Sequence, residues 1–307
     1  MPTEGPGTPS TSRPLPRFRR DAAAAPEIVL VSRDLALLED VWRYGVLSTS
    51  QIEALRLGDP DPAHRFVSRF TLTRRLKLLF HNRYLRRLPR AIPKGSLEPV
   101  YVLDAEGART LSLHHGEVSA KAPSRLPKSA ALDHLLGIAQ VRLSLSLPDR
   151  SDGTPACELA EWLPGDRVRF RVAMEGVGQR RQTVSVVPDG GAIIRAGGRR
   201  HYAFIEVDRS SEPQRTLTAK CRSYSAYWSS GGFAADWSVP RGMGFWVLFV
   251  VPSARRLETV LKAIAAAGGP RMMFKAALET DVRPGRIGEA VWLDGQSGKA
   301  CRAWELG

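Results

Sequence analysis

The sequence predicts an α+β protein of two domains: a small N-terminal domain of helices and a hairpin, and a C-terminal α/β domain with a central mixed sheet. A chain of 307 residues usually forms two domains, and 43% apolar residues supply a core for each. Helical spacing of apolar residues dominates residues 29–117, whereas β-prone runs joined by Gly-rich turns are frequent in residues 131–307. Residues 118–130 between them are rich in Pro, Ser and Lys, which predicts a linker.

The N-terminal segment, residues 1–28, is predicted to be a disordered basic tail, because it contains Pro, Gly, Ser, Thr and Arg but no hydrophobic signal core. The longest apolar run, residues 245–251, is too short to span a membrane. Three cysteines without a C-x-x-C pair disfavour a disulfide framework and a zinc finger, and the six histidines have no metal-ligand spacing. We therefore expect a cytoplasmic protein that has no membrane partner.

Three helices are predicted at the start of the N-terminal domain. Ser32 can cap the first helix, and Gly45 suits the left-handed residue after its end. Residues 48–51 (STSQ) form a capping box that opens the second helix. In the third helix, residues 70–82 (FTLTRRLKLLFHN), leucines at helical spacing face inward and Asn82 is the expected left-handed terminator.

Two short β-prone runs, residues 84–90 and 99–104, follow with a Pro/Gly/Lys loop between them, and residues 106–113 are expected to form a closing helix. Two helices, a basic third helix and a hairpin have the order of a winged helix-turn-helix. In that fold the third helix enters the major groove of DNA and the arginines of the hairpin contact phosphates. A winged helix can also serve protein contacts alone, and this alternative stays open.

The charge of the chain predicts a polyanionic partner, and double-stranded DNA is preferred to a membrane surface. The formal net charge is +14. No acidic residue lies between Asp61 and Glu98, whereas a solvated surface normally mixes both signs. The predicted DNA contacts in this basic segment are Arg69, Arg74, Arg75, Lys77, Arg83, Arg86, Arg87 and Arg90.

The C-terminal domain, residues 131–307, is predicted to run as a helix, several strands, a helix, an apolar strand and a last helix. Its residues 201–208 (HYAFIEVD) are predicted to form a strand. Side chains alternate along a strand, so Tyr202 and Phe204 are expected to share one face with Glu206 and Asp208. The two acids are therefore predicted to point the same way.

Three carboxylates are candidates for one site, because the hairpin before this strand can bring Asp189 alongside Glu206 and Asp208. Three hard oxygen donors suit Mg²⁺ or Mn²⁺, which polarise a phosphodiester and lower the pKa of an attacking water. Lys220, on the following helix, can reach the same pocket and balance the charge. The predicted metal ligands are Asp189, Glu206 and Asp208, and the predicted catalytic residues are these three with Lys220. The alternative is that the acids are ordinary turn and surface residues.

The order of several segments resembles the bacterial replication-relaxation family, over roughly residues 35–253. The segments are LLEDVWRYGVLSTSQIEAL, TRRLKLLFHNRYLRRL, VYVLDAEGARTL, DHLLGIAQVRLSL, VVPDG, FIEVDRS, AKCRSY and WVLFVVPS. Members of this family are associated with plasmids and other mobile elements. They are related to mobilisation relaxases whose C-terminal domain is similar to PD-(D/E)xK nucleases, so the resemblance implies a restriction-endonuclease-like fold for residues 131–307.

The resemblance also implies roles for particular residues. Pro188 and Asp189 match the PD element, and Glu206 matches the acidic position. Asp208 stands where the family pattern has lysine, which leaves cleavage open, and Lys220 is the candidate for a relocated lysine. The additional acid that such folds often carry near their first strand has two candidates, Glu158 and Glu161.

Charge and resemblance together predict a DNA-binding replication-relaxation protein of a plasmid or other mobile element, acting at a replication or transfer origin through its winged helix. Two alternatives are an active Mg²⁺-dependent nicking endonuclease or relaxase, and a transcription regulator with a non-catalytic C-terminal domain. A covalent tyrosine relaxase is disfavoured, because Tyr224 and Tyr227 suit the core side of an amphipathic helix. A second copy of the chain and other mobilisation or replication proteins stay open as partners.

Overall fold

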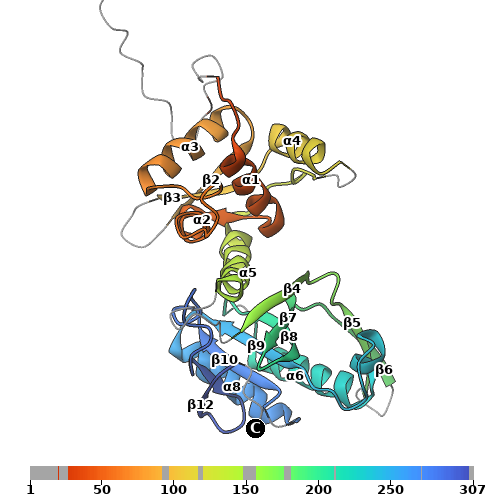
Figure 1. Cartoon of the computed structure of the whole chain (residues 1–307). Helices are drawn as coiled ribbons and strands as arrows, with labels where there is room; N and C mark the ends of the chain where they lie inside the picture. Colours follow the sequence, from red (N-terminus) through yellow and green to blue (C-terminus); the bar gives the residue numbers. More distant parts are fainter. Residues whose placement is uncertain are drawn as a thin grey trace, which may run out of the picture. The chain divides into compact units, whose positions relative to one another are not determined.

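The computed structural model describes residues 20, 27–91, 97–116, 120–147, 157–175, 181–210, 212–270 and 272–303. The chain divides into two compact units, Met1–Leu126 and Pro127–Gly307, coloured red to yellow and yellow-green to blue in Figure 1. The division falls inside the segment 118–130. The tail predicted for residues 1–28 lies outside the described residues, apart from Arg20, Glu27 and Ile28.

The first unit combines helices with a three-stranded antiparallel sheet of order β1-β3-β2. Its elements are α1 (Ser32–Tyr44), β1 (Leu47–Ser48), α2 (Thr49–Arg56), α3 (Arg69–His81), β2 (Leu85–Ala91), β3 (Leu97–Leu103) and α4 (Ala105–His115). The two β-prone runs pair from Leu85↔Leu103 to Ala91↔Leu97. The loop between them, residues 92–96, lies outside the described residues. Leu72, Leu76 and Leu79 of α3 are fully buried, as their helical spacing predicts.

Local hydrogen bonds explain where the first helices begin. The capping box predicted for α2 is confirmed: the Ser48 hydroxyl accepts from the Gln51 amide N–H, and the Ser48 N–H donates to Gln51 Oε1 at 3.0 Å. In α1 the cap position is Val31, one residue before the predicted Ser32. The Asp34 carboxylate takes the role of a capping side chain there, because it accepts the N–H of Val31 at 2.8 Å.

The ends of α1 and α3 differ in how well the sequence predicted them. Gly45 has a φ of 75° after α1, in agreement with the prediction. Asn82 was expected to be left-handed after α3, and this is wrong: its φ is −86°, and its side-chain amide donates to the carbonyl of Leu78. The left-handed residue is Arg83, whose φ is 63°. The turn out of α3 therefore comes one residue later than predicted.

The second unit is built on a seven-stranded mixed sheet of order β12-β11-β10-β9-β8-β7-β4. Strands β8, β9 and β10 are parallel, and the remaining neighbours are antiparallel. Its strands are β4 (Glu158–Pro164), β5 (Phe170–Glu175), β6 (Arg181–Val186), β7 (Gly190–Ala196), β8 (Arg199–Val207), β9 (Trp246–Val251), β10 (Phe274–Leu278), β11 (Trp292–Asp294) and β12 (Ala300–Cys301). Strands β5 and β6 form a separate hairpin.

Helices cover both faces of this sheet. They are α5 (Ser129–Ser146), α6 (Gln214–Ser229), α7 (Gly232–Asp236) and α8 (Ala254–Ala267). One core joins α6, α7, α8 and the β5–β6 hairpin to one face of the sheet, and a second core joins α5 to the other face. The alternation predicted along β8 is confirmed, because Tyr202 and Phe204 belong to the first core whereas Ala203 and Ile205 belong to the second.

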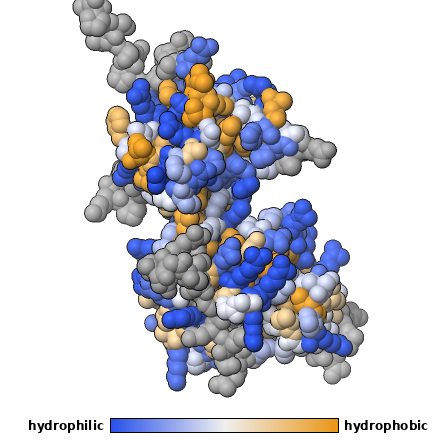
Figure 2. Space-filling view, in the orientation of Figure 1, coloured by the Kyte–Doolittle hydropathy of each residue, from blue (hydrophilic) through white to orange (hydrophobic). Residues whose placement is uncertain are grey.

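The surface is mixed in character. Figure 2 shows hydrophilic residues over much of the visible face of each unit, with smaller hydrophobic patches between them. Within the described residues, no helix is both long and apolar enough to cross a bilayer.

Candidate functional site

The hairpin of β7 and β8 brings Asp189 next to the end of β8. The last pair of this hairpin is Gly190↔Ile205, so Asp189 lies one step further, opposite Glu206. The main chain of Asp189 donates to the carbonyl of Ile205 at 3.0 Å, and its Oδ2 accepts the N–H of Val207 at 2.7 Å. These two hydrogen bonds fix the carboxylate of Asp189 against the backbone of the strand that carries Glu206.

Glu206 is buried, with 4% of its surface exposed, and helix α6 supplies both of its partners. The Tyr224 hydroxyl donates to Oε1 at 2.6 Å, and the Lys220 ammonium donates to Oε2 at 3.0 Å. Tyr224 and Lys220 are separated by one helical turn, so both side chains reach the same carboxylate. The sequence prediction that Lys220 lies beside Glu206 agrees with this geometry.

Burial and charge shift the pKa values of this pair. Burial raises the pKa of Glu206 to about 7, against the lowering effect of Lys220, and the neighbouring charge of Asp189 raises it further. Burial alone would lower the pKa of Lys220, but the charges of Glu206 and Glu212 outweigh it and raise that pKa above its ordinary value. Lys220 therefore stays protonated at neutral pH, whereas Glu206 changes its protonation state near pH 7.

Asp208 does not join this pair. Its side chain, 5% exposed, is held by Arg256 of α8, with 2.6 Å between Arg256 Nη2 and Asp208 Oδ2. Arg256 Nε is also within hydrogen-bond distance of both oxygens of Asp208, and Arg256 Nη2 donates to the carbonyl of Glu212. Asp208 therefore ties the end of β8 to the start of α8.

The three-carboxylate cluster predicted from the sequence does not form. Within the described residues, no group of three or more His, Cys, Asp and Glu side chains is arranged to hold a metal ion. Strand alternation placed Asp208 on the face of Glu206, but β8 ends at Val207 and a guanidinium at the start of α8 takes the carboxylate. Asp189 and Glu206 remain as a pair of interacting carboxylates.

A histidine that the sequence prediction left without a role contacts Asp189. His134, near the start of α5, places Nε2 3.0 Å from Asp189 Oδ1. The hydrogen bond to Asp189 raises the pKa of His134, despite its partial burial. No motif could have revealed this contact, because it joins residues 55 positions apart through the packing of α5 on the sheet.

The two candidates for an additional acid lie along β4. Glu158 is exposed, and its carboxylate forms an ion pair with Arg195 at 3.7 Å. In the strand register Glu158 also lies opposite Arg195, at the end of β7 that is far from Asp189. Glu161 is exposed opposite Ile193. Neither contacts Glu206 through any interaction found in the described residues.

Helix α3 carries the basic residues of the first unit on two different faces. Arg74 is exposed and Lys77 is partly exposed, and neither side chain has a hydrogen bond or ion pair within the described residues. Arg83, just after the helix, is exposed in the same way. Phe70, 75% exposed, lies one helical turn before Arg74. Phe70, Arg74 and Lys77 therefore form one exposed face of α3, which we call the α3 face.

Two of the predicted DNA contacts, Arg75 and Arg87, have partners inside their own unit. Arg75 faces the protein, where its Nη2 lies 2.5 Å from Oδ2 of the fully buried Asp34. Arg87 is 9% exposed, and its guanidinium lies over the rings of Phe80 and Tyr101 at 4.8 and 5.4 Å from their centroids. Arg75 is 20% exposed and Arg87 is 9% exposed, so both guanidiniums are engaged inside their own unit, and contact of these two arginines with DNA stays a prediction.

The other basic residues of the prediction lie at the surface with acidic partners. In these pairs the arginine side chains remain partly or largely exposed: 72% for Arg69, 41% for Arg86 and 29% for Arg90. The pairs are Arg69 with Glu53, Arg86 with Asp104, and Arg90 with Glu98. The acids of these pairs are more buried than the arginines, with side chains 17%, 2% and 15% exposed for Glu53, Asp104 and Glu98, so a phosphate can approach each arginine from its solvent side.

Fold and site together define an α+β protein with an exposed basic helix in one unit and, in the other, a buried carboxylate–lysine pair at the carboxyl end of the interior strand β8. The family model described as replication-relaxation matches residues 38–237. Because that match covers more than half of the 307 residues, the chain belongs to the replication-relaxation family, as its motifs predicted. A search of curated proteins found no match.

Two solved structures share a weak likeness with the chain. The restriction endonuclease FokI matches with a TM-score of 0.30 and 11% identity, over 84% of this chain and 44% of the FokI chain. FokI bound to DNA matches with a TM-score of 0.26 and 11% identity, over 82% and 43%. The chain thus spans less than half the length of FokI, and at these TM-scores the likeness supports no conclusion about fold or activity.

Proposed function

We propose that this chain is a DNA-binding protein of a plasmid or other mobile element that binds double-stranded DNA at a replication or transfer origin. The observation that carries the proposal is the α3 face. One side of α3 is buried in the core of its unit, and the other presents Phe70, Arg74 and Lys77 to solvent. A helix held this way offers two cations and an aromatic ring to a groove without breaking any contact of its own.

The arrangement around α3 supports a winged helix. Helices α1, α2 and α3 precede an antiparallel β2–β3 pair, which is the order of that fold. If α3 enters the major groove, the exposed Arg83 and the surface arginines of β2 are available to neighbouring phosphates. The net charge of +14 adds a sequence-independent attraction that weakens as salt rises.

A salt titration of duplex binding tests this proposal on the full chain. Replacing Arg74 and Lys77 by alanine is expected to cost about 1–3 kcal/mol for each side chain that contacts a base, and to make binding less sensitive to salt for each one that contacts a phosphate. The matched control replaces Arg43 and Arg109, which carry the same charge and are 57% and 64% exposed on α1 and α4. Equal losses of affinity in both double variants would show attraction by total charge alone and contradict the proposal.

A second candidate function, Mg²⁺-dependent nicking of DNA, is favoured by the Asp189–Glu206–Lys220 arrangement. Mg²⁺ is commonly bound by one or two carboxylates, with water and substrate phosphate as its other ligands, so the Asp189–Glu206 pair suits it. When bound, the ion would polarise the phosphodiester and activate water. Lys220 stays protonated and can neutralise charge on a phosphate oxygen, while Tyr224 orients Glu206.

Nicking is tested with supercoiled plasmid and Mg²⁺ or Mn²⁺. The nicked form is expected with the parent chain, and Asp189→Ala is expected to abolish it while duplex binding is unchanged. Glu289→Ala, at a side chain that is 52% exposed and paired only with Arg286 in the interactions described, is the matched loss of an acid and should nick like the parent. No nicking by a parent chain that binds duplex DNA would leave the second unit non-catalytic and this candidate refuted.

A further inference from the structure

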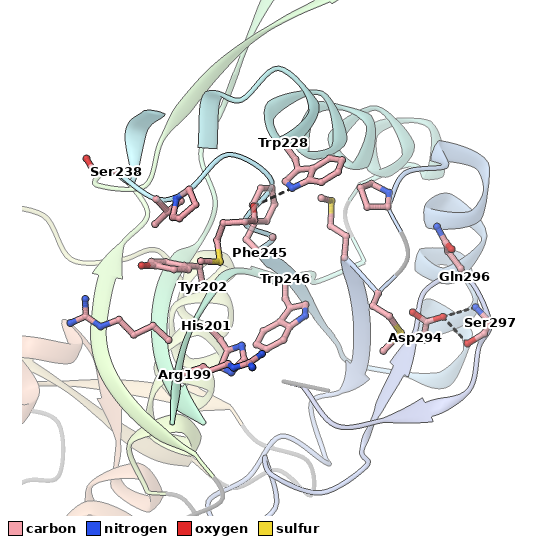
Figure 3. A pocket seen from close by; sticks show the side chains of 18 residues that line it. Arg199, His201, Tyr202, Trp228, Ser238, Phe245, Trp246, Asp294, Gln296 and Ser297 are labelled. Atoms are coloured by element: carbon pink, nitrogen blue, oxygen red, sulfur yellow. Dashed lines mark hydrogen bonds between the residues drawn. The ribbon is translucent and has the colours of Figure 1, made fainter. Parts of the chain in front are cut away.

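The second unit contains a pocket of about 1250 Å³ at the end of the sheet opposite the acid pair (Figure 3). It opens at the amino ends of β8, β9 and β10, where Arg199, Trp246 and Met273 line it. From Arg199 to Glu206 strand β8 rises by roughly 3.3 Å per residue, about 23 Å in all. The pocket is therefore separate from the Asp189–Glu206 pair.

Aromatic and methionine side chains form its walls. In Figure 3 the rings of Trp228 and Trp246 lie on opposite sides of the cavity. The indole of Trp246 is held in place, because the His201 ring stacks on it at 4.8 Å and 17° and the Lys275 ammonium lies 4.9 Å from its centroid. Trp228 donates its indole N–H to the carbonyl of Met243. Walls of this kind suit a flat ring system.

One buried polar atom in the pocket lacks a partner. Asp294 is 4% exposed, and its Oδ1 accepts from the N–H and the hydroxyl of Ser297 at 2.7 and 2.6 Å. Its Oδ2 is buried without a hydrogen bond in the described part of the chain. Burial would raise the pKa of Asp294, but the hydrogen bonds from Ser297 outweigh it and the pKa is lowered. Leaving a buried, ionised oxygen without a hydrogen-bond donor costs free energy, so we expect a ligand to donate a hydrogen bond to Asp294 Oδ2.

The rim of the pocket is positively charged. Arg199 and Arg200 are exposed and line the pocket, and neither side chain has a hydrogen bond or ion pair within the described residues. They complement a phosphate, which Arg binds with two parallel hydrogen bonds. The volume of about 1250 Å³ exceeds the usual range for small-molecule pockets, about 300–1,000 Å³, so the pocket has room for a base with its sugar and phosphate.

We propose that this pocket binds a guanine nucleotide unit, either as a free nucleotide or as an unpaired residue of a DNA strand. The base lies against the aromatic wall, its N–H groups donate to Asp294 Oδ2, and its phosphate lies at the arginine rim, within reach of Arg199 or Arg200. Guanine presents two adjacent donors, the ring N–H and the amino group. Thymine presents one N–H flanked by two carbonyl oxygens, which a carboxylate repels.

The test titrates the full chain with dGMP and dTMP by calorimetry. We expect dGMP to bind at least tenfold more tightly than dTMP, and Asp294→Asn to remove this difference while the thermal unfolding midpoint shows that the variant is folded. Replacing Arg199 and Arg200 by alanine, both exposed, should weaken dGMP but leave deoxyguanosine unchanged. No binding of dGMP by the folded parent, or equal binding by Asp294→Asn, would overturn the proposal.

Two further ligands separate the sources and the two proposals. A short dT oligonucleotide with one central guanine should compete with dGMP if a DNA strand is the source, whereas failure of the oligonucleotide alone assigns the pocket to free nucleotides. This inference rests on the proposed function only in that the partner is a nucleic acid. Duplex affinity, which depends on the α3 face, is measured on the same preparations. A parent chain that binds dGMP but not duplex DNA would refute the proposed function, and one that binds duplex DNA but not dGMP would refute the pocket proposal.

Discussion

The two units hold their functional charges in opposite ways. On the α3 face, Arg74 and Lys77 have no partner within the described residues. In the second unit each acid near the carboxyl end of β8 has a nitrogen partner: His134 for Asp189, Lys220 for Glu206 and Arg256 for Asp208. A free surface cation can meet a phosphate without rearrangement, whereas a paired buried carboxylate must exchange its partner before it binds a metal. DNA binding therefore needs no rearrangement of the described contacts, whereas metal-dependent cleavage needs at least one ion pair to open.

The largest expected effect comes from breaking a buried pair in the second unit. Arg256→Met removes the partner of Asp208, whose side chain is 5% exposed, and should lower the free energy of unfolding by about 3–5 kcal/mol. Chemical denaturation measures this loss. Arg286→Met is the control, because Arg286 is 47% exposed and its pairs with Asp281 and Glu289 lie at the surface. A loss below 1 kcal/mol for Arg256→Met would show that the pair is not structural.

A smaller effect is expected from pH. The pKa of Glu206 is raised from 4.5 to about 7, so its contribution to stability is complete below the lower value and is lost as pH rises through the upper one. The raised pKa of His134 acts in the same direction, with its contribution lost above 6.5. The free energy of unfolding should therefore fall by about 1–3 kcal/mol between roughly pH 5 and pH 8. Glu206→Gln should flatten this fall, and an unchanged slope in the variant would contradict the assignment.

The smallest expected effect concerns Phe70. Because this side chain is 75% exposed, Phe70→Ala should leave the unfolding midpoint unchanged. If the ring contacts a thymine methyl group, duplex affinity should fall by about 1 kcal/mol or less, and only for sites that carry that thymine. Val67→Ala, at an 85% exposed apolar residue before α3, is the matched control. A loss that is the same for every duplex sequence would show that Phe70 reads no base.

Sequence patterns predicted most of what depends on neighbouring residues. Helical spacing identified the buried leucines of α3, the STSQ box identified the start of α2, and strand alternation placed Glu206 on the face that meets α6. Lys220 was predicted beside Glu206 because a helix follows that strand closely in the chain. The helix features are decided within a few residues, and the contact between Lys220 and Glu206 joins two consecutive elements, 14 residues apart.

Contacts between distant segments could not be predicted in the same way. Asp208 was assigned to a metal site because nothing in residues 201–208 shows that Arg256 lies beside it. Arg75 and Arg87 were assigned to DNA because a run of basic residues does not show which side chains turn inward to Asp34 or to the ring of Phe80. His134 gave no signal for Asp189 for the same reason. The number of charged residues in a segment does not show in which direction each side chain points.

Two adjacent arginines of α3 test the central claim most directly. Arg74 is exposed, whereas Arg75 is 20% exposed and paired with the buried Asp34. The measurement is duplex affinity and unfolding midpoint for Arg74→Ala and Arg75→Ala in the full chain. The account predicts that Arg74→Ala weakens DNA binding by about 1–3 kcal/mol with an unchanged midpoint, and that Arg75→Ala lowers the midpoint while the folded protein binds DNA like the parent. Unchanged affinity in Arg74→Ala, or an equal loss of affinity in both variants, would contradict it.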